Sequence, residues 1–498
     1  MRHITLKRAL LPVLISSLFP AITYADGNDT EVRIQELQKQ MQLMSEELAA
    51  MQKQLANAKE DEVKEKGKSQ GAPVYAAFKD GLVLEDGTGN WALQINGRVQ
   101  ADYHAIDPSE WKNDGFSIRR ARLGATFTFL KDFAVRVEGE YANSNDGAKG
   151  TTALTYGYLE YNHFPGARVR VGQFKPIFGL ERGESTNFTD FNELSLATAT
   201  GPSFNSTYDR GVMLFGSPFK GTYYNLSYVN GSGQNNDDNG NSKDYVGRVA
   251  ANIADWADWK NAVVHVGVSA SKGAVQSSTS PNSTALSGYT EANGITSNTA
   301  AYTGNTATKF FSTSAFTSND LDKDRLGLET ALAYGPVKFQ SEYISTNFDG
   351  QTKTKKSIDK DIDAWYASVT WLVTGESYAD SYKNGMFNRI YPKHSLAWGK
   401  DGFGAIELGL RYSSFDASDF TTAAQGCVAG TGCLTASAAT TAFTNKADAW
   451  TAGAKWILTP NARLILDYVH TNFDTPVKIN SQASDYEDAV AMRAQYDF

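Results

Sequence analysis

The chain is notable first for what it lacks. After Ala25, no stretch approaches about eighteen consecutive apolar residues, which excludes a membrane-spanning helix. The six histidines are scattered, and there is no HExxH, GxSxG or phosphate-binding glycine loop, so no enzyme, cofactor or metal site is expected. The formal net charge is −8, which argues against a protein that binds nucleic acid or an anionic membrane surface.

Cysteine is also scarce. The two cysteines, Cys427 and Cys433, lie in "GCVAGTGC", within a segment rich in Gly, Ala and Thr. In an oxidising compartment this spacing favours a local disulfide that holds a loop. The spacing is not CxxC and no histidine lies nearby, which argues against a metal or redox role for the pair.

The N-terminus indicates export. Arg2, Lys7 and Arg8 precede an apolar run that ends at Leu18, and "TYA" ends at Ala25 before the polar "DGN". This order of a basic region, a short apolar core and small residues predicts a signal peptide over residues 1–25. An exported chain of this size is either a soluble periplasmic or secreted protein or an outer-membrane β-barrel.

Residues 26–66 predict a periplasmic coiled coil that helps to oligomerise the chain. Apolar residues alternate spacings of three and four along this segment, which is the seam of a heptad repeat, at Ile34, Leu37, Met41, Met44, Leu48, Met51 and Leu55. A single amphipathic helix is the alternative. Residues 67–90 have the composition of a linker and lead into the next unit.

Residues 91–498 change to a period of two, typical of β-strands. In "FSIRRARLGATFTF", one set of alternating residues is apolar (Ala121, Leu123, Ala125, Phe127, Phe129) and the other is polar (Arg120, Arg122, Gly124, Thr126, Thr128). Short connections alternate with long polar loops, and Tyr and Phe are abundant. The pattern predicts an all-β, antiparallel transmembrane barrel of about 16 strands.

The last ten residues, "AVAMRAQYDF", support the same fold. Val490, Met492, Ala494, Tyr496 and Phe498 share one face of the predicted closing strand. A terminal Phe on the apolar face resembles the signal read by the machinery that assembles outer-membrane barrels.

The free energy of burial decides which way the arginines face. If Arg120 and Arg122 faced lipid near the bilayer midplane, each would cost roughly 2–4 kcal/mol. The same one-residue shift would turn Leu123 and Phe127 toward water. We therefore expect both arginines inside the barrel. Arg119 has the apolar parity, and we expect it at a strand end or a β-bulge.

Basic residues on neighbouring predicted strands extend this polar face. Arg120, Arg122, Arg136, Arg168 and Arg170 are expected to form a patch on one wall, and the same strands carry Glu138, Glu140 and Glu160. One interpretation is cross-strand Arg–Glu pairing that stabilises a polar lumen. The other, which we prefer, is a track that guides anions through a narrow pore.

Several segments resemble the phosphate-selective porins of the O and P type. They occur in the family's order and are "LQINGRVQADY", "IRRARLG" with "LKDF", "VGQFKPIFGLE", "VTGESYADSY", "GAIELGLRYS" and "AGAKWILTPNARLILDYVH". The resemblance implies a homotrimeric 16-stranded porin in the outer-membrane lipid, which passes phosphate or related small inorganic anions through a constricted lumen. It assigns Arg119, Arg120 and Arg122 to the lumen wall and Lys175 to the strand that enters a constricting loop. With Arg182 they complete the candidate anion pathway.

Two positions depart from the family and weaken the case for phosphate in particular. Leu194 stands where relatives often carry a basic residue, and Tyr156 stands at an acidic position. A general or sugar-permeable porin is the main alternative, since Tyr156 and Tyr158 hint at an aromatic slide. A barrel whose coiled coil tethers the outer membrane to the cell wall, or an outer-membrane hydrolase, are further alternatives.

Overall fold

The computed structural model describes residues 73–498, with gaps at 79, 109–114, 143–151, 200–206, 237, 239–242, 276–284, 293–307, 398, 400, 436–442 and 480–481. It also describes four helical residues of the N-terminal segment, Lys39, Gln42, Glu46 and Ala50. The chain divides into two units, Met1–Pro73 and Val74–Phe498. The predicted signal peptide and the seam of the predicted coiled coil lie outside the described residues.

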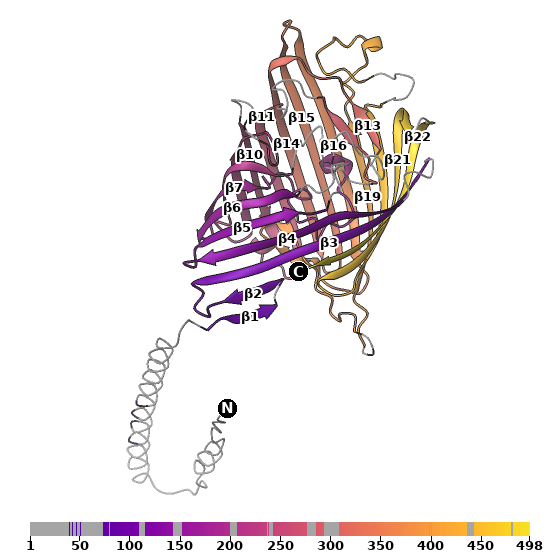
Figure 1. Cartoon of the computed structure of the whole chain (residues 1–498). Helices are drawn as coiled ribbons and strands as arrows, with labels where there is room; N and C mark the ends of the chain where they lie inside the picture. The colour runs from indigo at the N-terminus through magenta and orange to yellow at the C-terminus, as the bar shows by residue number, and fades with distance from the viewer. Residues whose placement is uncertain are drawn as a thin grey trace, which may run out of the picture. The chain divides into compact units, whose positions relative to one another are not determined.

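Sixteen strands of the second unit form a closed antiparallel barrel among the described residues (Figure 1). Each pairs with the next one along the chain, and the last pairs with the first. They are β3 (Trp91–Asp107), β4 (Gly115–Phe129), β5 (Phe133–Glu140), β6 (Ala153–Phe164), β7 (Ala167–Phe174), β8 (Asp209–Gly216), β9 (Thr222–Val229), β10 (Asp244–Asn252), β11 (Ala262–Ala274), β14 (Ser318–Tyr334), β15 (Val337–Thr352), β16 (Ser357–Leu372), β19 (Ala405–Asp416), β20 (Lys446–Ile457), β21 (Ala462–Ile479) and β22 (Gln482–Asp497). The prediction of an antiparallel barrel of about 16 strands is confirmed.

The alternation in β4 separates an outer from an inner face. Leu123 and Phe127 are 50% and 43% exposed on the outside, whereas Arg120 is 7% exposed and lies inside. In the pairing with β3, Gln100 faces Arg120 and the next residue, Ala101, faces Ile118. Arg119 is therefore the extra residue of a β-bulge, which turns its side chain inward despite its apolar parity.

The chain end closes the barrel against β3. The Phe498 amide donates to the Gly97 carbonyl at 2.9 Å, and the Gly97 amide donates to the Phe498 carbonyl at 2.8 Å. A Cβ at position 97 would lie 2.8 Å from the Arg122 carbonyl oxygen and 2.9 Å from the Phe498 ring. Glycine is therefore required for this close approach. A hairpin of β1 (Tyr75–Phe78) and β2 (Leu82–Glu85) extends the sheet beside β3.

Most connections at one end of the barrel are short turns, for example at residues 130–132, 165–166 and 335–336. The β10–β11 turn at this end contains helix α3 (Ile253–Trp256). The connection from β16 to β19 also leaves from this end and is much longer. It carries α4 (Tyr378–Ser381), β17 (Tyr382–Lys383) and β18 (Met386–Phe387), and it folds back against the inner wall. There the Tyr382 hydroxyl lies 2.6 Å from Nδ1 of His265, and Arg248 donates to the Gly385 carbonyl at 2.9 Å.

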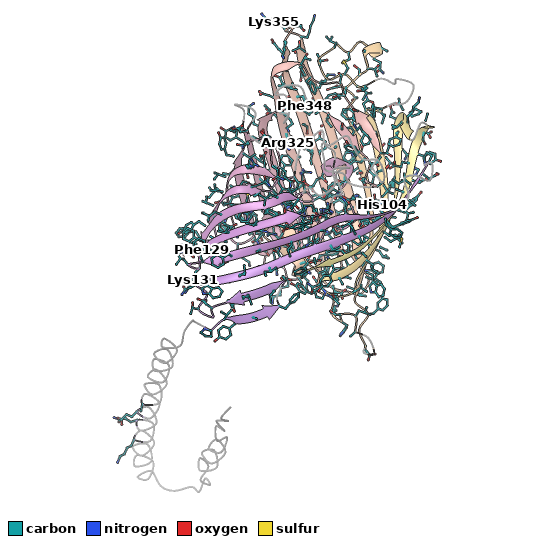
Figure 2. All side chains as sticks on the ribbon, viewed as in Figure 1. His104, Phe129, Lys131, Arg325, Phe348 and Lys355 are labelled. Carbon is teal, nitrogen blue, oxygen red and sulfur yellow. A yellow bond between two sulfur atoms is a disulfide. The ribbon has the colours of Figure 1, made fainter. Side chains whose placement is uncertain are left out.

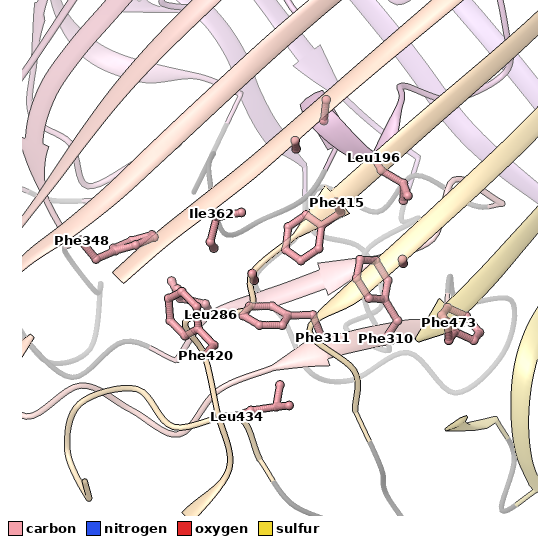
Figure 3. Close-up of a cluster of buried hydrophobic side chains, with 14 of the residues drawn as sticks. Leu196, Leu286, Phe310, Phe311, Phe348, Ile362, Phe415, Phe420, Leu434 and Phe473 are labelled. Carbon is pink, nitrogen blue, oxygen red and sulfur yellow. The ribbon is translucent and has the colours of Figure 1, made fainter. Parts of the chain in front are cut away.

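The long loops at the opposite end build an aromatic cap. Their elements include β12 (Ser287–Tyr289), β13 (Lys309–Ser312) and the turn η1 (Ala423–Gln425), which is followed by the disulfide Cys427–Cys433. Seven buried phenylalanines from loops and inner wall form the cap (Figure 3): Phe310, Phe311, Phe316, Phe348, Phe415, Phe420 and Phe473. The cap lies against the inner faces of β15, β16, β19 and β20, so it leaves less of this side to solutes.

Within the described residues no helix is long and apolar enough to span a membrane.

Candidate functional site

A segment that follows β7 narrows the lumen. This constricting segment, residues 175–199, ends in helix α2 (Leu196–Ala199) and leaves the wall for the interior. Near its start, the carboxylate of Glu342 on β15 accepts hydrogen bonds from the amides of Leu180 and Glu181 at 2.7 and 2.6 Å. Farther along, Asp467 on β21 accepts from the Asn192 amide at 2.6 Å. The segment thus contacts walls on different sides of the barrel.

Cations from the far wall hold the tip of the constricting segment. Lys455 on β20 donates to the Thr189 carbonyl at 2.9 Å, and Lys338 on β15 donates to the Asp190 carboxylate at 2.7 Å. Phe191 packs so closely on β20 that a Cβ at Gly453 would lie 2.8 Å from its ring. These contacts fix the loop across the lumen.

The two arginines at the bulge have different partners. Arg119 Nε donates to Oε1 of Glu193 on the constricting segment at 2.9 Å. The same carboxylate accepts from Arg493 of β22 at 2.7 Å, so two guanidinium groups share it. Arg120 Nη1 instead donates to the amide oxygen of Gln100 at 2.8 Å, a neutral partner.

The other predicted arginines of the wall lie beside carboxylates. Arg122 Nε donates to Glu140 at 2.6 Å, and Arg136 donates to Glu138 at 2.6 Å. Arg170 donates to Glu160 at 2.7 Å, and Arg168 lies 3.9 Å from the same carboxylate. The structure therefore brings together the four arginines on β4, β5 and β7 and pairs each with a glutamate of its own or a neighbouring strand. Their positive charge is largely compensated locally.

Aromatic rings stack on these guanidinium groups. Arg136 lies over the Tyr156 ring at 4.5 Å from its centroid, and Arg170 lies over the Tyr158 ring at 4.1 Å. Arg168 lies over Phe215 at 4.4 Å. One face of each ring is therefore covered by an arginine, an arrangement that stabilises both groups.

Lys175 and Arg182 both bind backbone carbonyls of the constricting segment. Lys175 Nζ donates to the carbonyls of Arg182 and Glu184 at 2.9 and 2.6 Å, and Arg182 Nη1 donates to the Thr198 carbonyl at 2.9 Å. Burial, and then the nearby Arg182 guanidinium, lowers the pKa of Lys175 to about 7. Lys175 therefore shapes the segment and also places a titratable charge in it.

Arg98 on β3 adds a cation beside the same segment. Its Nη1 donates to the Thr186 hydroxyl at 2.7 Å and to the Asn187 side-chain oxygen at 2.6 Å. Within the described part of the chain, Arg98, Arg120 and Lys175 thus donate to neutral oxygens and form no ion pair with a carboxylate. This group of three differs from the compensated arginines of the wall.

The sequence comparisons identify the family. The model of "Phosphate-selective porin O and P" matches residues 93–498. The chain belongs to this porin family. Porin O of Pseudomonas aeruginosa is 25% identical over 443 residues, which cover 86% of this chain and 94% of that one. The fold and the family together make the protein an outer-membrane porin.

Among solved structures, the chain is similar to outer-membrane porins at low sequence identity. The anion-selective porin from Comamonas acidovorans is 12% identical, with 82% of this chain and 100% of that chain covered and a TM-score of 0.48. OprB of Pseudomonas putida is 9% identical, with 82% and 95% covered and a TM-score of 0.48.

Arg98, Lys323 and Arg325 are among the inner cations of this porin that the sequence analysis missed. Lys323 and Arg325 lie on the inner face of β14 and line a cavity together with Arg182 (Figure 2 labels Arg325). A signal was present in "LDKDRLGLE", because Leu326 and Leu328 have the opposite parity and are 48% and 52% exposed on the outside. The prediction was based on the alternation in β4 and its neighbours, near the N-terminal end of the barrel, and did not extend to β14.

Proposed function

We propose that this porin is an outer-membrane diffusion channel that prefers small anions, including phosphate and related oxyanions. The observation that carries the proposal is the group of Arg98, Arg120 and Lys175 beside the constricting segment, whose partners are neutral oxygens. Uncompensated positive charge in a narrow, low-dielectric passage attracts anions and repels cations. The compensated arginines of β4, β5 and β7 contribute a weaker field.

Phosphate is the solute named in the description of the family. Two features of this chain argue for a broader preference among anions. Leu194 supplies no charge to the constricting segment, and the Arg119 guanidinium is engaged by Glu193. The pathway therefore favours general attraction of anions over tight binding of one ion.

The reversal potential across a planar bilayer in a KCl gradient tests the proposal. The wild-type channel is expected to favour chloride, and Arg120→Gln is expected to reduce the chloride-to-potassium permeability ratio about twofold or more, because one uncompensated charge disappears. The matched control is the double variant Glu160→Gln and Arg170→Gln, which removes a compensated pair and should leave the ratio nearly unchanged. Cation preference of the wild type would overturn the proposal.

A sugar-permeable porin is the second candidate. It is favoured by the edge-to-face pair of Tyr156 and Tyr208, whose ring centroids lie 5.0 Å apart. Stacking of Arg136 on Tyr156 argues against it, because a sugar would have to displace the guanidinium group. Swelling of proteoliposomes in maltose, compared with swelling in an equal concentration of gluconate, distinguishes the two candidates.

The porin is further proposed to be a homotrimer in which residues 26–66 form a periplasmic coiled coil. The heptad seam of that segment supports this assembly. Chemical crosslinking of the full chain and of a chain that lacks residues 26–66 tests it. A crosslinked trimer that weakens on deletion is expected; an unchanged trimer would favour the tethering role for the segment.

A further inference from the structure

A mixed-charge cavity lies between the constricting segment and the wall of β8, β10 and β14. The cavity is partly open, and its empty space, open solvent included, is about 480 Å³. Its charged lining consists of Arg182 from the constricting segment, Asp209 and Asp244 from β8 and β10, and Lys323 and Arg325 from β14.

Among the described residues that line this cavity, Lys323 is a charged group with no partner. Lys323 is 2% exposed, and its ammonium group forms no hydrogen bond or ion pair with any described residue. Arg325, Asp244, Asp209 and Arg182 are the charged groups that act on it through space. A buried ammonium is costly without an acceptor, so the cavity calls for an anionic or strongly accepting ligand beside Lys323.

The two arginines of the cavity, Arg182 and Arg325, are positioned to bind the same anionic ligand as Lys323. Arg182 is held by the Thr198 carbonyl at 2.9 Å, and Arg325 Nε donates to the Ser271 hydroxyl at 2.7 Å. Phe178 lies under the Arg325 guanidinium, 5.1 Å from its ring centroid. The guanidinium groups are thus fixed in place before any ligand arrives, which lowers the entropic cost of binding.

The two carboxylates of the cavity differ in how many hydrogen bonds they already accept. Asp209 accepts from the amides of Arg210, Gly231 and Gly233 at 2.7, 2.9 and 3.3 Å. Asp244 accepts through Oδ1 from Ala274, and its Oδ2 has no hydrogen bond within the described residues. Asp244 therefore retains an acceptor for a ligand hydroxyl or amine. Phe178, Val229 and Val246 complete the lining with apolar surface that suits a carbon skeleton.

We propose that this cavity binds a small organic anion that carries a hydrogen-bond donor, such as a hydroxylated carboxylate or phosphate monoester. The anionic group lies among Lys323, Arg325 and Arg182, and the donor faces Asp244. Among the described lining residues, three are positively charged and two negatively charged, a combination that suits one anionic group. The inference rests on the channel activity proposed above, because solutes reach the cavity through the lumen.

Block of single-channel current by gluconate tests the inference, with hexanoate as a probe of equal chain length without hydroxyls. Gluconate should reduce the KCl current of the wild-type channel at concentrations at least about tenfold lower than hexanoate requires. Lys323→Met should weaken gluconate block about tenfold or more, because the charged hydrogen bond is lost. Asp244→Asn should narrow the preference for gluconate over hexanoate.

Lys272→Met is the matched control. Gly273 on β11 is the cross-strand neighbour of Lys323, and Lys272 directly precedes it. The Lys272 side chain, however, is 69% exposed and pairs with Asp324. This variant should leave gluconate block unchanged, and a heat-induced gel shift like that of the wild type shows that the barrel of each variant is folded. Equal block by gluconate and hexanoate, or gluconate block that survives Lys323→Met, would overturn the inference. An anion-selective channel that gluconate does not block would also overturn it while leaving the proposed function intact; cation selectivity of the wild type would reject the function itself.

Discussion

Arg119 and Glu193 join the wall to the constricting segment. The Arg119 guanidinium donates to the carboxylate through Nε at 2.9 Å and through Nη2 at 3.3 Å. Both side chains are at least nine-tenths buried, and Arg493 approaches the same carboxylate from β22. A β-bulge that exposes an arginine to the interior thus anchors a loop 74 residues away.

Glu193→Gln should shift the channel toward anions and loosen the constriction. The substitution removes the negative charge that Arg119 and Arg493 share, whereas Arg493 keeps Asp102 at 2.7 Å. We expect a higher chloride-to-potassium permeability ratio and noisier single-channel current, together with a loss of stability of about 3–5 kcal/mol from the broken buried pair. Reversal potentials and the temperature at which the folded band disappears in gel electrophoresis measure both effects.

The control for this variant is Asp416→Asn, which breaks a half-exposed pair with Lys446 near the long loops. A pair of that kind contributes only about 0–1 kcal/mol. Similar unfolding temperatures for the two variants would contradict the anchoring role of Glu193.

Local periodicity explains why the strands and their faces could be predicted. Alternation placed Arg120 inside and Leu123 outside, and the wrong parity of Arg119 indicated a bulge. The partner of Arg119 could not be predicted in the same way. Glu193 and Arg493 are 300 residues apart in sequence, and the path of a loop through a lumen depends on such distant contacts. No period in the sequence encodes them.

The inward fold of the β16–β19 connection was missed for a related reason. Tyr382 and Phe387 of this connection turn back and pack on inner-wall residues. Apolar residues in a loop indicate burial without indicating against which wall. The same applies to Lys323: its inward orientation could be predicted from the alternation, but its neighbours in the cavity, Arg182 and Asp209, could not.

The preference for anions should fall as the pH rises through about 7. Burial lowers the pKa of Lys175 to about 7, so this amine loses its positive charge between about pH 6 and pH 8. The neutral amine still has hydrogens for the carbonyls of Arg182 and Glu184, so the segment keeps its shape. Permeability ratios measured across this window should change roughly twofold.

Lys175→Arg isolates the contribution of Lys175 to this pH dependence, because arginine stays charged throughout this pH window. Burial also raises the pKa of Glu184 well above its usual range, and its ionisation at higher pH acts in the same direction. The arginine variant should therefore show a smaller change, and Glu184→Gln should remove the remainder. A wild-type ratio that rises with pH would contradict the assignment.

The aromatic cap should contribute substantially to stability. Phe311 is fully buried and packs edge-to-face on Phe415 and Phe420, at centroid distances of 5.4 and 5.5 Å. Phe311→Ala should cost about 3–5 kcal/mol, because it leaves a cavity among rings that cannot collapse around it. Phe219→Ala, at a turn residue that is 74% exposed, should change stability by no more than about 0.5 kcal/mol. Heat-induced gel shifts compare the two, and equal shifts would contradict a packed cap.

Spin labels on β4 test the division between lipid and lumen directly. Leu123 and Phe127 lie on the outer face, so cysteine-attached labels there should collide with oxygen dissolved in the bilayer. A label at Thr126, which shares the inner parity with Arg122 and lies opposite Gln94 and Arg136, should collide instead with a water-soluble nickel complex. Because successive side chains of a strand alternate, a one-residue error in register would exchange the two results at every position. A mixed outcome confined to position 119 is expected from the bulge alone, since the extra residue breaks the alternation only where β4 gains it.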